Sequence, residues 1–508
     1  MDVPLDGDEG ELVVSEDIDD EACFCFVDKS DTGADKNGYD RGLDYKEPGL
    51  TFVTGIDIVS LLPPEISVFI FSLLPQPRTR GFTRAPHTYG WGLQDILTSS
   101  LVCHNWSRLS NDNAIWRRAY AQWWGEPTSP QPVLQKHWKP LFMRRIILDE
   151  RWTQTSFQPP LSRLVGHEDS VYTVEYCRVA RLFVSGSRDR TIRIWDSRTH
   201  ACLAILGTPK GYSGADGEGH SGSVLCLKLM RLPTTKGARA DAFLMVSGSS
   251  DRNICVWTFE VEREGAMSPV RASKRRRLPA AAARSPRPRG VTWRVVATLR
   301  GHADGVLDLR LVDTANGKWI VSCSKDSTIR VWNRETMKEH RVLRGHDGPV
   351  NAVGVQDTRI VSASGDGKMI LWNIDSGERL RTFEGHERGL ACIEFKDDTI
   401  ISGSNDCKIK VWSAATGECL RTLSGHSALV RALSYDSATG RLVSASYDRT
   451  IKVWDSRFVG QIIREFKGCH TSHIFDVQFD AGQIVTTSHD RKITILDFSE
   501  DHEDLCLL

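Results

Sequence analysis

The chain has 508 residues, of which 40% are hydrophobic and 26% charged, so it is long enough for more than one globular domain with a large core. Its formal net charge is zero although the first fifty positions are acidic and the stretch between Glu260 and Gly290 is basic, so whole-chain charge gives no argument for nucleic-acid binding. Thirteen cysteines without a C-x-x-C pair favour a reducing, intracellular setting. We expect a soluble protein with neither a signal peptide nor a membrane span.

The first 54 residues are acidic, and we expect them to be disordered. From Leu61 to Leu74 the string LLPPEISVFIFSLL begins with prolines suited to a first helical turn and continues with apolar residues at helical spacing. A second string, LQDILTSSLVCHNWSRLSNDNAIWRRAY, has a looser helical pattern. Two or three short helices cannot bury this much apolar surface alone, so a partner is predicted.

Together these strings resemble an F-box, which implies docking on a Skp-family adaptor of a cullin/RING ligase core. We assign the F-box to residues 55–122, with an internal loop at about 76–91, and a helical linker containing WKPLFMRRIILDERW to residues 123–155. Alternatively, these helices form a cap folded onto the next domain. The resemblance implies adaptor contacts from Leu62, Pro63, Ile66, Leu73, Leu101, Val102, Cys103 and Trp106.

The dipeptide Gly-His then recurs six times, and a degenerate seventh copy ends in His470. Each copy is followed by a strand-like segment and a signature such as VSGSRDRTIRIWD or VSASYDRTIKVWD. In six signatures an Asp precedes a Trp by the same interval, and the later histidines are about 40 to 44 residues apart, which is the WD-repeat period. These motifs closely resemble WD repeats.

In that family a His, an Asp, a Ser and a Trp of each repeat form a hydrogen-bonded set that locks the blade, and such sets persist when every member is paired. The residues assigned to this structural role are His167, Asp189, Trp195, His220, Asp251, Trp257, His302, Asp326, Trp332, His346, Asp366, Trp372, His386, Asp406, Trp412, His426, Asp448 and Trp454. Each His and Asp pair belongs to its own blade, so we favour locking over metal binding or acid–base chemistry. The seventh repeat has Leu496 in place of Trp, and its blade is predicted to be held mainly by packing.

Seven repeats predict seven four-stranded blades around a channel. The predicted fold class is therefore an all-β, seven-bladed WD40 β-propeller over residues 156–499, preceded by a small all-α F-box and linker helices and followed by a tail, 500–508. The string LSRLV, before the first Gly-His, is expected to supply the outer strand of the last blade beside KITILDF, which removes an exposed edge.

Two insertions interrupt the repeats: residues 207–218 between blades one and two, and residues 259–292 between blades two and three. The second contains SKRRRLPAAAARSPRPRG and is predicted to be disordered. Its basic cluster, Lys274 to Arg277, is either a nuclear-import signal near Ser-Pro phosphorylation sites or part of a solvated loop without a targeting function. Localisation is therefore left open between cytoplasm and nucleus.

The Gly-His loop and the Asp turn must lie at one end of each blade because their side chains are expected to bond. Residues just after the first and just before the second are thus predicted to face one channel mouth. Three arginines and a lysine converge there, which suits a phosphate group. The simpler interpretation of any single arginine is a solvated charge.

Strings such as GHSGSVLCL, GHERGLACI and QFDAGQIVTTSHD make the chain similar to β-TrCP, the β-transducin-repeat F-box proteins. That resemblance implies a peptide ligand with two phosphoserines flanking an Asp-Ser-Gly-type turn. The predicted phosphopeptide-binding residues are Tyr172, Arg188, Ser223, Leu225, Ser250, Lys325, Asn351, Arg388, Gly389, Ala391, Leu429, Arg431, Tyr447 and His473. The family has arginine where this chain has His473, so the grip there is expected to be weaker or pH-sensitive.

We therefore expect a non-catalytic substrate-recognition subunit of an SCF-type ubiquitin ligase, acting by proximity. No cofactor, metal, nucleic acid or membrane partner is expected. The acidic segment shows no dimerisation helix of the kind that β-TrCP proteins carry, so homodimerisation is not expected. Alternatives are a Cdc4-like or sulfur-regulating receptor with a different degron, and a WD40 scaffold without a ligase role.

Overall fold

The computed structural model describes residues 104–124, 138–177, 180–207, 219–233, 239–263, 289–455 and 460–499, which all belong to one structural unit. The helices among them are α4 (His104–Ser110), α5 (Asn113–Trp124) and α6 (Trp138–Thr153), and none is long and apolar enough to cross a membrane. The predicted acidic segment, the helix from Leu61 to Leu74, the loop at 76–91 and the tail lie outside the described residues.

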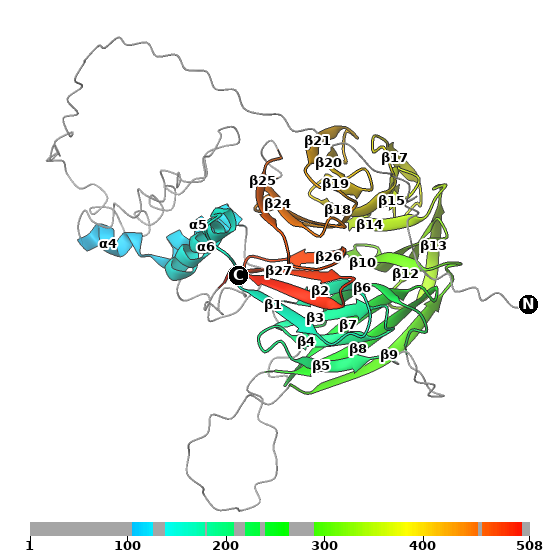
Figure 1. Ribbon diagram of the computed structural model, residues 1–508, viewed down its shortest axis with the longest axis horizontal. Helices are drawn as coiled ribbons and strands as arrows, with labels where there is room; N and C mark the ends of the chain where they lie inside the picture. Colours follow the sequence, from blue (N-terminus) through cyan, green and yellow to red (C-terminus); the bar gives the residue numbers. More distant parts are fainter. Residues whose placement is uncertain are drawn as a thin grey trace, which may run out of the picture. The chain divides into compact units, whose positions relative to one another are not determined.

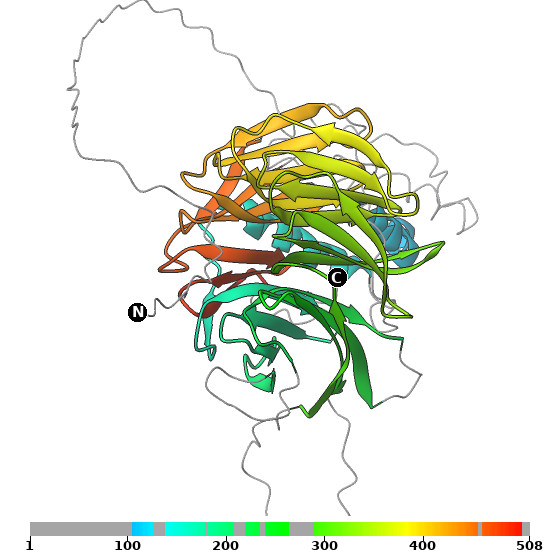
Figure 2. The same ribbon diagram turned by 90° about the vertical axis from the view of Figure 1, so that its right-hand side faces the viewer.

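The described strands form seven four-stranded antiparallel sheets, which are the blades of a propeller (Figure 1). The blades follow the order of the chain, from teal through green and yellow to orange and red (Figure 2). The fold class predicted from the repeats is confirmed.

Blade one holds β2 (Val171–Cys177), β3 (Leu182–Ser187), β4 (Ile192–Asp196) and β5 (Cys202–Leu206); blade two holds β6 (Val224–Arg231), β7 (Ala240–Ser249), β8 (Asn253–Glu262) and β9 (Val291–Arg300). Blade three holds β10 (Val306–Thr314), β11 (Gly317–Ser324), β12 (Thr328–Asn333) and β13 (Lys338–Arg344); blade four holds β14 (Val350–Gln356), β15 (Arg359–Ser364), β16 (Met369–Asn373) and β17 (Arg379–Phe383). Blade five holds β18 (Leu390–Lys396), β19 (Thr399–Ser404), β20 (Lys408–Ser413) and β21 (Cys419–Ser424); blade six holds β22 (Val430–Asp436), β23 (Arg441–Ser446), β24 (Ile451–Asp455) and β25 (Ile462–Phe466). Blade seven holds β26 (Ile474–Phe479), β27 (Gln483–Ser488), β28 (Lys492–Asp497) and β1 (Leu161–Val165).

The ring is closed by β1, which comes before blade one in the chain but pairs with the last strand of blade seven. The pairing is antiparallel, with Leu161 opposite Leu496 and Val165 opposite Lys492. In Figure 1 the teal β1 lies beside the red strands of the chain's end. Because β1 covers β28, the last blade gains its fourth strand from a distant part of the sequence, as the string LSRLV predicted.

The basic insertion lies inside blade two, and the prediction that it separates blades two and three is wrong. β9 is the fourth strand of blade two, and Val261 of β8 lies opposite Val291 of β9. The interval 259–292 therefore begins and ends in paired strand, because Phe259 and Val261 alternate into the core and extend β8. Residues 264–288, with the basic cluster from Lys274 to Arg277, lie outside the described residues.

Apolar side chains gather in seven clusters of the described residues, one between each pair of neighbouring blades. Six clusters each contain one of the repeated tryptophans. The seventh cluster, between blades six and seven, contains Leu496 instead and also takes in Trp116, Phe142 and Trp152 of the helices. The boundary that lacks a blade tryptophan is thus the one on which the helices pack.

Each of the first six blades contains the predicted four-residue set as an unbroken chain of hydrogen bonds. The Trp Nε1–H donates to the Ser hydroxyl over 2.8–2.9 Å. That hydroxyl lies 2.7–2.9 Å from His Nε2, and His Nδ1 lies 2.7–3.1 Å from the Asp carboxylate. Since the carboxylate only accepts, Nδ1 carries a proton, and wherever the imidazole is neutral its Nε2 accepts the Ser O–H, so that every member is paired.

The seventh blade keeps most of this set, so the prediction that packing mainly holds it is wrong. His470 Nδ1 lies 3.0 Å from Asp490 Oδ2, and its Nε2 lies 2.9 Å from the hydroxyl of Thr486. Leu496 removes only the tryptophan donor. Thr486 takes the place of the serine, and its hydroxyl supplies the O–H that pairs with His470 Nε2.

We predict that Ser402→Ala destabilises the propeller by about 2–4 kcal/mol, because it leaves two buried polar groups, Trp412 Nε1 and His386 Nε2, without a partner. The measurement is denaturant unfolding followed by circular dichroism. Ser437→Ala, at a half-buried turn position, is the matched control and is expected to unfold like the unsubstituted chain. Equal stability of the two variants would contradict the locking role.

We also predict that the melting temperature falls as the pH is lowered from about 6.5 towards 4. Burial lowers the pKa of His167, His302 and His346, so the stability they contribute is complete above the ordinary histidine pKa and is lost as the pH falls through it. For His220 the lowering effect of burial is outweighed by Asp251 and Cys255, which raise its pKa to about 9. The stability that His220 contributes is therefore constant between pH 4 and 6.5 and is lost only as the pH rises towards 9. A melting temperature that stays constant from pH 6.5 to 4, measured by scanning calorimetry, would refute the neutral-imidazole arrangement.

Candidate functional site

The channel mouth is built by the first strands of the seven blades, which contact one another all the way round the ring. In each of these strands the second residue is skipped in the pairing with the next strand, so seven β-bulges occupy equivalent positions. The skipped residues, here called the bulge ring, are Tyr172, Leu225, Leu307, Asn351, Ala391, Arg431 and Phe475. A bulge takes its residue out of the ladder and re-aims its side chain, which is typical of binding sites.

A second ring consists of the residue that precedes the turn Asp of each blade. Its backbone N–H donates to the carbonyl of the residue two places before the bulge, over 2.8–3.0 Å in all seven blades. Arg188 bonds Ser170 in this way, and Tyr447 bonds Leu429. The hydrogen bond ties the turn to the loop that enters the inner strand, so bulge, turn and loop residues share one end of the channel.

The structure distributes all of the predicted phosphopeptide-binding residues over these three positions. The bulge ring holds Tyr172, Leu225, Asn351, Ala391 and Arg431; the turns hold Arg188, Ser250, Lys325 and Tyr447; and the entering loops hold Ser223, Arg388, Gly389, Leu429 and His473. Ala391 and Leu429 are buried, whereas Lys325, Arg388 and His473 are exposed. Binding of a peptide by these residues stays a prediction.

Two arginines of the mouth contact neighbouring residues of the propeller. Arg188 Nε lies 4.0 Å from Asp169 Oδ2, and Arg431 donates to the carbonyl of Ala391 over 3.4 Å. Ser250 Oγ accepts the N–H of Ser223 over 2.9 Å, which leaves the hydroxyl proton for a ligand. The mouth thus offers guanidinium groups and a hydroxyl to an anion.

One side of the mouth is an aromatic wall formed by Tyr172, Phe475, Tyr447 and His473. The ring centroids of Tyr172 and Phe475 are 4.9 Å apart, and those of Tyr447 and His473 are 4.6 Å apart. His473 Nδ1 lies 3.0 Å from the carbonyl oxygen of Tyr447, which only accepts, so Nδ1 carries the proton of the neutral ring. Its Nε2 is then an acceptor, unlike the arginine that the β-TrCP resemblance implies here.

Beneath the mouth lies a belt of charged residues that sequence reasoning missed, made of Glu175, Lys228, Asp308, Arg310, Glu394 and Asp476. Lys228 pairs with Glu175, and Arg310 lies 2.8 Å from Asp308 and 3.8 Å from Glu394. Burial raises the pKa of Asp476 to about 6. The available signal was their position one or three residues after a bulge residue. Because carboxylates outnumber cations in the belt, an anion is favoured at the mouth and disfavoured deeper in the channel.

The linker helix α6 is anchored to blades six and seven. Trp152 is fully buried, stacks on Phe498 with centroids 4.1 Å apart, and donates from Nε1 to the carbonyl of Ala481 over 2.8 Å. Arg441 of blade six lies over the Trp152 ring, 4.4 Å from its centroid. Arg151 donates to the carbonyl of Phe498 over 2.7 Å. The end of α6 is therefore fixed by aromatic, cationic and hydrogen-bonding contacts.

Asp149 connects α5, α6 and the propeller. Its Oδ2 accepts Trp124 Nε1 of α5 over 2.6 Å, and its Oδ1 lies 3.4 Å from Arg441. Around it, Phe142 of α6 packs edge-on against Trp116 of α5, with centroids 5.2 Å apart. The helices and the last two blades thus share one core.

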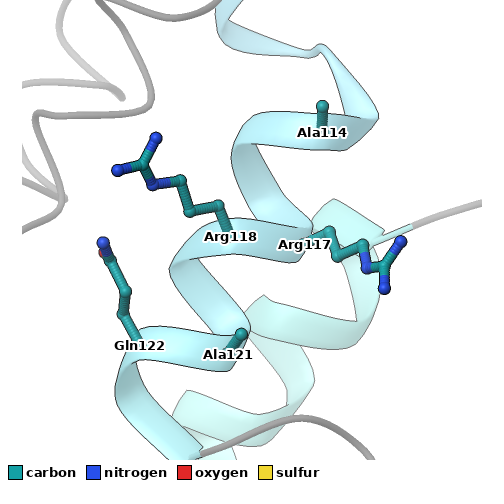
Figure 3. A pocket seen from close by; sticks show the side chains of 5 residues that line it. All are labelled: Ala114, Arg117, Arg118, Ala121 and Gln122. Carbon is teal, nitrogen blue, oxygen red and sulfur yellow. The ribbon is translucent and has the colours of Figure 1, made fainter.

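Of the predicted adaptor contacts, only Trp106 is among the described residues. It is half-buried in α4 and packs against the cluster shared by the helices and blade seven. On α5 a shallow hollow of about 380 Å³ is lined by Ala114, Arg117, Arg118, Ala121 and Gln122. Arg118 and Gln122 project from the same side of the helix (Figure 3). The hollow belongs to the helical region and is separate from the channel mouth.

Comparison with known families matches the WD domain, G-beta repeat, at residues 158–196, 215–258, 293–333, 337–373, 377–413 and 417–455. The F-box-like family matches residues 59–122, a range that ends in α5. The chain combines an F-box-like region with WD40 repeats. The seventh blade follows the last matched repeat, in keeping with its replaced tryptophan.

Several curated proteins are similar to parts of this chain. F-box/WD repeat-containing protein 7 of Drosophila melanogaster is 30% identical over 161 residues, which are 30% of this chain and 11% of that protein. WD repeat-containing protein pop1 of Schizosaccharomyces pombe is 29% identical over 39% of this chain and 24% of its own length. Cell division control protein 4 of Saccharomyces cerevisiae is 25% identical over 40% and 23%, respectively. The matches thus span about a quarter or less of these relatives.

We predict that Trp152→Ala loosens α6 from the WD40 propeller and costs about 3–5 kcal/mol of stability, because a fully buried indole and its hydrogen bond are lost. Limited proteolysis should cut faster between α6 and β1, and thermal unfolding should begin earlier. Trp124→Ala is the matched control, since its ring contacts are with other helical residues. Cleavage at the same rate in both variants would contradict the anchoring role of Trp152.

Proposed function

We propose that this protein is the substrate-recognition subunit of an SCF-type ubiquitin ligase, with a Skp-family adaptor bound to its F-box-like region and a phosphorylated protein bound at the channel mouth. It contributes no catalytic residue, and it promotes ubiquitination and degradation of the bound protein by bringing lysines close to a conjugating enzyme. The single observation that carries the proposal is the joint occurrence of the F-box-like region and a propeller with a basic mouth.

The mouth supports an anionic peptide as ligand. Arg431 belongs to the bulge ring, and Arg188 and Arg388 come from the adjoining turn and loop positions. A phosphoserine carries about −1.5 to −2 charges, which arginine binds through paired hydrogen bonds. The acidic belt below disfavours entry of the anion into the channel, so the peptide is bound across the mouth. The aromatic wall supplies apolar area for the residues between the charges.

The rigid path from the mouth to α5 supports the proximity mechanism. Trp152, Asp149 and Arg441 join the propeller to α6, and α6 to α5 at the end of the F-box-like region. A substrate held at the mouth would therefore keep a defined position relative to α5. A flexible linker would spread the same substrate over a larger volume and lower its effective concentration.

We predict that a doubly phosphorylated Asp-Ser-Gly peptide binds and its unphosphorylated twin does not. Arg188→Ala with Arg431→Ala should weaken binding by about 2–5 kcal/mol, because each arginine loses a charge-assisted hydrogen bond. Fluorescence anisotropy on the full chain is the measurement, and Arg344→Ala on the exposed end of β13 is the control. Equal binding of the two peptides would overturn the phosphate proposal.

The adaptor half of the proposal needs its own experiment. Co-purification of the full chain with a Skp-family adaptor should be lost on Ile66→Asp, which puts a charge into the predicted adaptor-binding face. Phosphopeptide binding should be unchanged in that variant. Peptide binding without any adaptor binding by the unsubstituted chain would favour the alternative, a WD40 scaffold without a ligase role.

The degron class is the finer part of the proposal. The β-TrCP resemblance favours two phosphoserines around an Asp-Ser-Gly turn, while the similar proteins include cell division control protein 4, which supports the Cdc4-like alternative. His473, in place of arginine, is the residue at which this mouth differs from the β-TrCP pattern. Peptides that differ in the spacing of their two phosphates separate the two classes.

A further inference from the structure

The residue after the turn Asp of each blade has a left-handed backbone, and in four blades it is an arginine. Arg449, Arg491, Arg190 and Arg252 have φ of 65°, 64°, 73° and 72°. They lie on blades six, seven, one and two, which follow one another round the ring because β1 joins blade seven to blade one. We call these four residues the arginine arc.

Local structure does not account for arginine at these positions. The other three blades carry Ser327, Gly367 and Cys407 in the same conformation. Glycine and asparagine adopt the left-handed region at the lowest cost, so four arginines retain a local strain that their turns do not require. Strain of this kind is an argument for function when an observed outlier is its starting point.

The arc is also available for binding. Arg252, Arg449 and Arg491 are exposed, and Arg190 is half-buried. Within the described part of the chain, none of the four guanidinium groups makes a hydrogen bond or an ion pair, although neighbouring Arg188 does. Four cations without internal partners on successive blades make one side of this face positive.

The residue that follows the blade histidine differs between the arc and the other blades. The residue after the blade histidine is a hydroxyl residue beside three members of the arc: Ser221, Ser427 and Thr471. Blade one has Glu168 there, and blades four and five, outside the arc, have the exposed Asp347 and Glu387. An acidic chain is therefore attracted to blades six, seven, one and two and repelled by Asp347 of blade four, whereas Glu387 of blade five is paired with Lys408 over 2.8 Å.

A hollow of about 540 Å³ lies at the blade-six end of the arc. Arg449, Lys452 and Lys467 line it together with Glu465 and Asp448. Glu465 pairs with both lysines, and Asp448 is bonded to the blade histidine, so three cations face two carboxylates and one positive charge is in excess. The hollow gives the arc a concave end into which a carboxylate side chain fits.

We propose that the arginine arc binds an acidic segment, rich in Asp and Glu, that flanks the phosphorylated residues of the recognised protein. The inference rests on the proposed function, because it takes the flank to belong to the peptide at the mouth. Arg190 is two residues from Arg188 of the mouth, so a chain that leaves the mouth towards blade one meets the arc. Separate exposed arginines suit several weak ion pairs along an extended chain better than one buried phosphate.

The test varies flank and phosphates separately, with anisotropy on the full chain. One peptide carries the doubly phosphorylated core with neutral Gly-Ser flanks, a second adds Asp and Glu to the flanks, a third is the unphosphorylated twin of the first, and a fourth is an acidic dodecamer without a core. The proteins compared are the unsubstituted chain and Arg190→Asn, Arg252→Asn, Arg449→Asn, Arg491→Asn combined. Asparagine tolerates the left-handed backbone, so this variant is expected to fold. Ser327→Asn with Cys407→Asn is the matched control on blades three and five.

The acidic flank is expected to strengthen binding about tenfold to the unsubstituted chain and to the control, and the four-Asn variant should lose this gain. All three proteins should bind the neutral-flank peptide equally, and the gain should shrink as salt rises from about 0.05 M to about 0.5 M. An equal gain in the four-Asn variant overturns the inference. If the core peptide binds equally well with and without its phosphates, the proposed function fails. Loss of dodecamer binding in the four-Asn variant would still support binding of an acidic segment by the arginine arc.

A rival occupant is the chain's own acidic segment, residues 1–54. If the flank strengthens binding only after Asp and Glu of residues 2–21 are changed to Asn and Gln, that segment holds the arc and the inference is overturned. A flank effect that is already present in the unsubstituted chain supports the recognised protein as occupant.

Discussion

The hydrogen-bonded set of His, Asp and hydroxyl residue in every blade, with Trp in six, is the interaction on which the structure depends. It fixes the loop that enters the inner strand against the turn two strands later. The bulge, turn and loop residues of the mouth are held in place by this set and by the turn-to-loop hydrogen bond beside it. Their positions therefore follow from a buried polar network that tolerates no unpaired member, while their side chains remain free to vary.

Buried contacts also fix the position of the helices. The cluster between blades six and seven lacks a blade tryptophan, and Trp152 of α6 stacks there on Phe498. Asp149 then joins α6 to Trp124 and to Arg441 by hydrogen bonding and charge. One core thus serves both the propeller and the F-box-like region, so damage to that core is expected to disturb both.

Most of the fold could be predicted from the sequence because each blade repeats its own signals. Gly-His, Asp and Trp fixed the number of blades, and LSRLV predicted the closing strand. The seventh blade was misjudged because the missing tryptophan was taken to remove the whole set, whereas His470 still bonds Thr486 and Asp490.

The insertion in blade two was also misplaced, since Pro- and Arg-rich composition masked the strand ends that pair at Val261 and Val291. The candidate mouth followed from the same repeats. The bulges, the charged belt and the arginine arc did not, because register, burial and backbone φ arise from how neighbouring strands pair.

The closing strand also sets the order in which the protein can be completed during synthesis. Leu161 of β1 and its partner Leu496 are about 335 residues apart, so at ~5–20 residues per second the ribosome takes roughly 17 to 67 seconds to supply the partner. Until then β1 has an unpaired edge and blade one has no seventh blade against which to pack. The α6 anchor waits for the same part of the chain, because Phe498 and Ala481 are made together with blade seven. The nascent chain therefore stays dependent on protection from aggregation until its final blade leaves the ribosome.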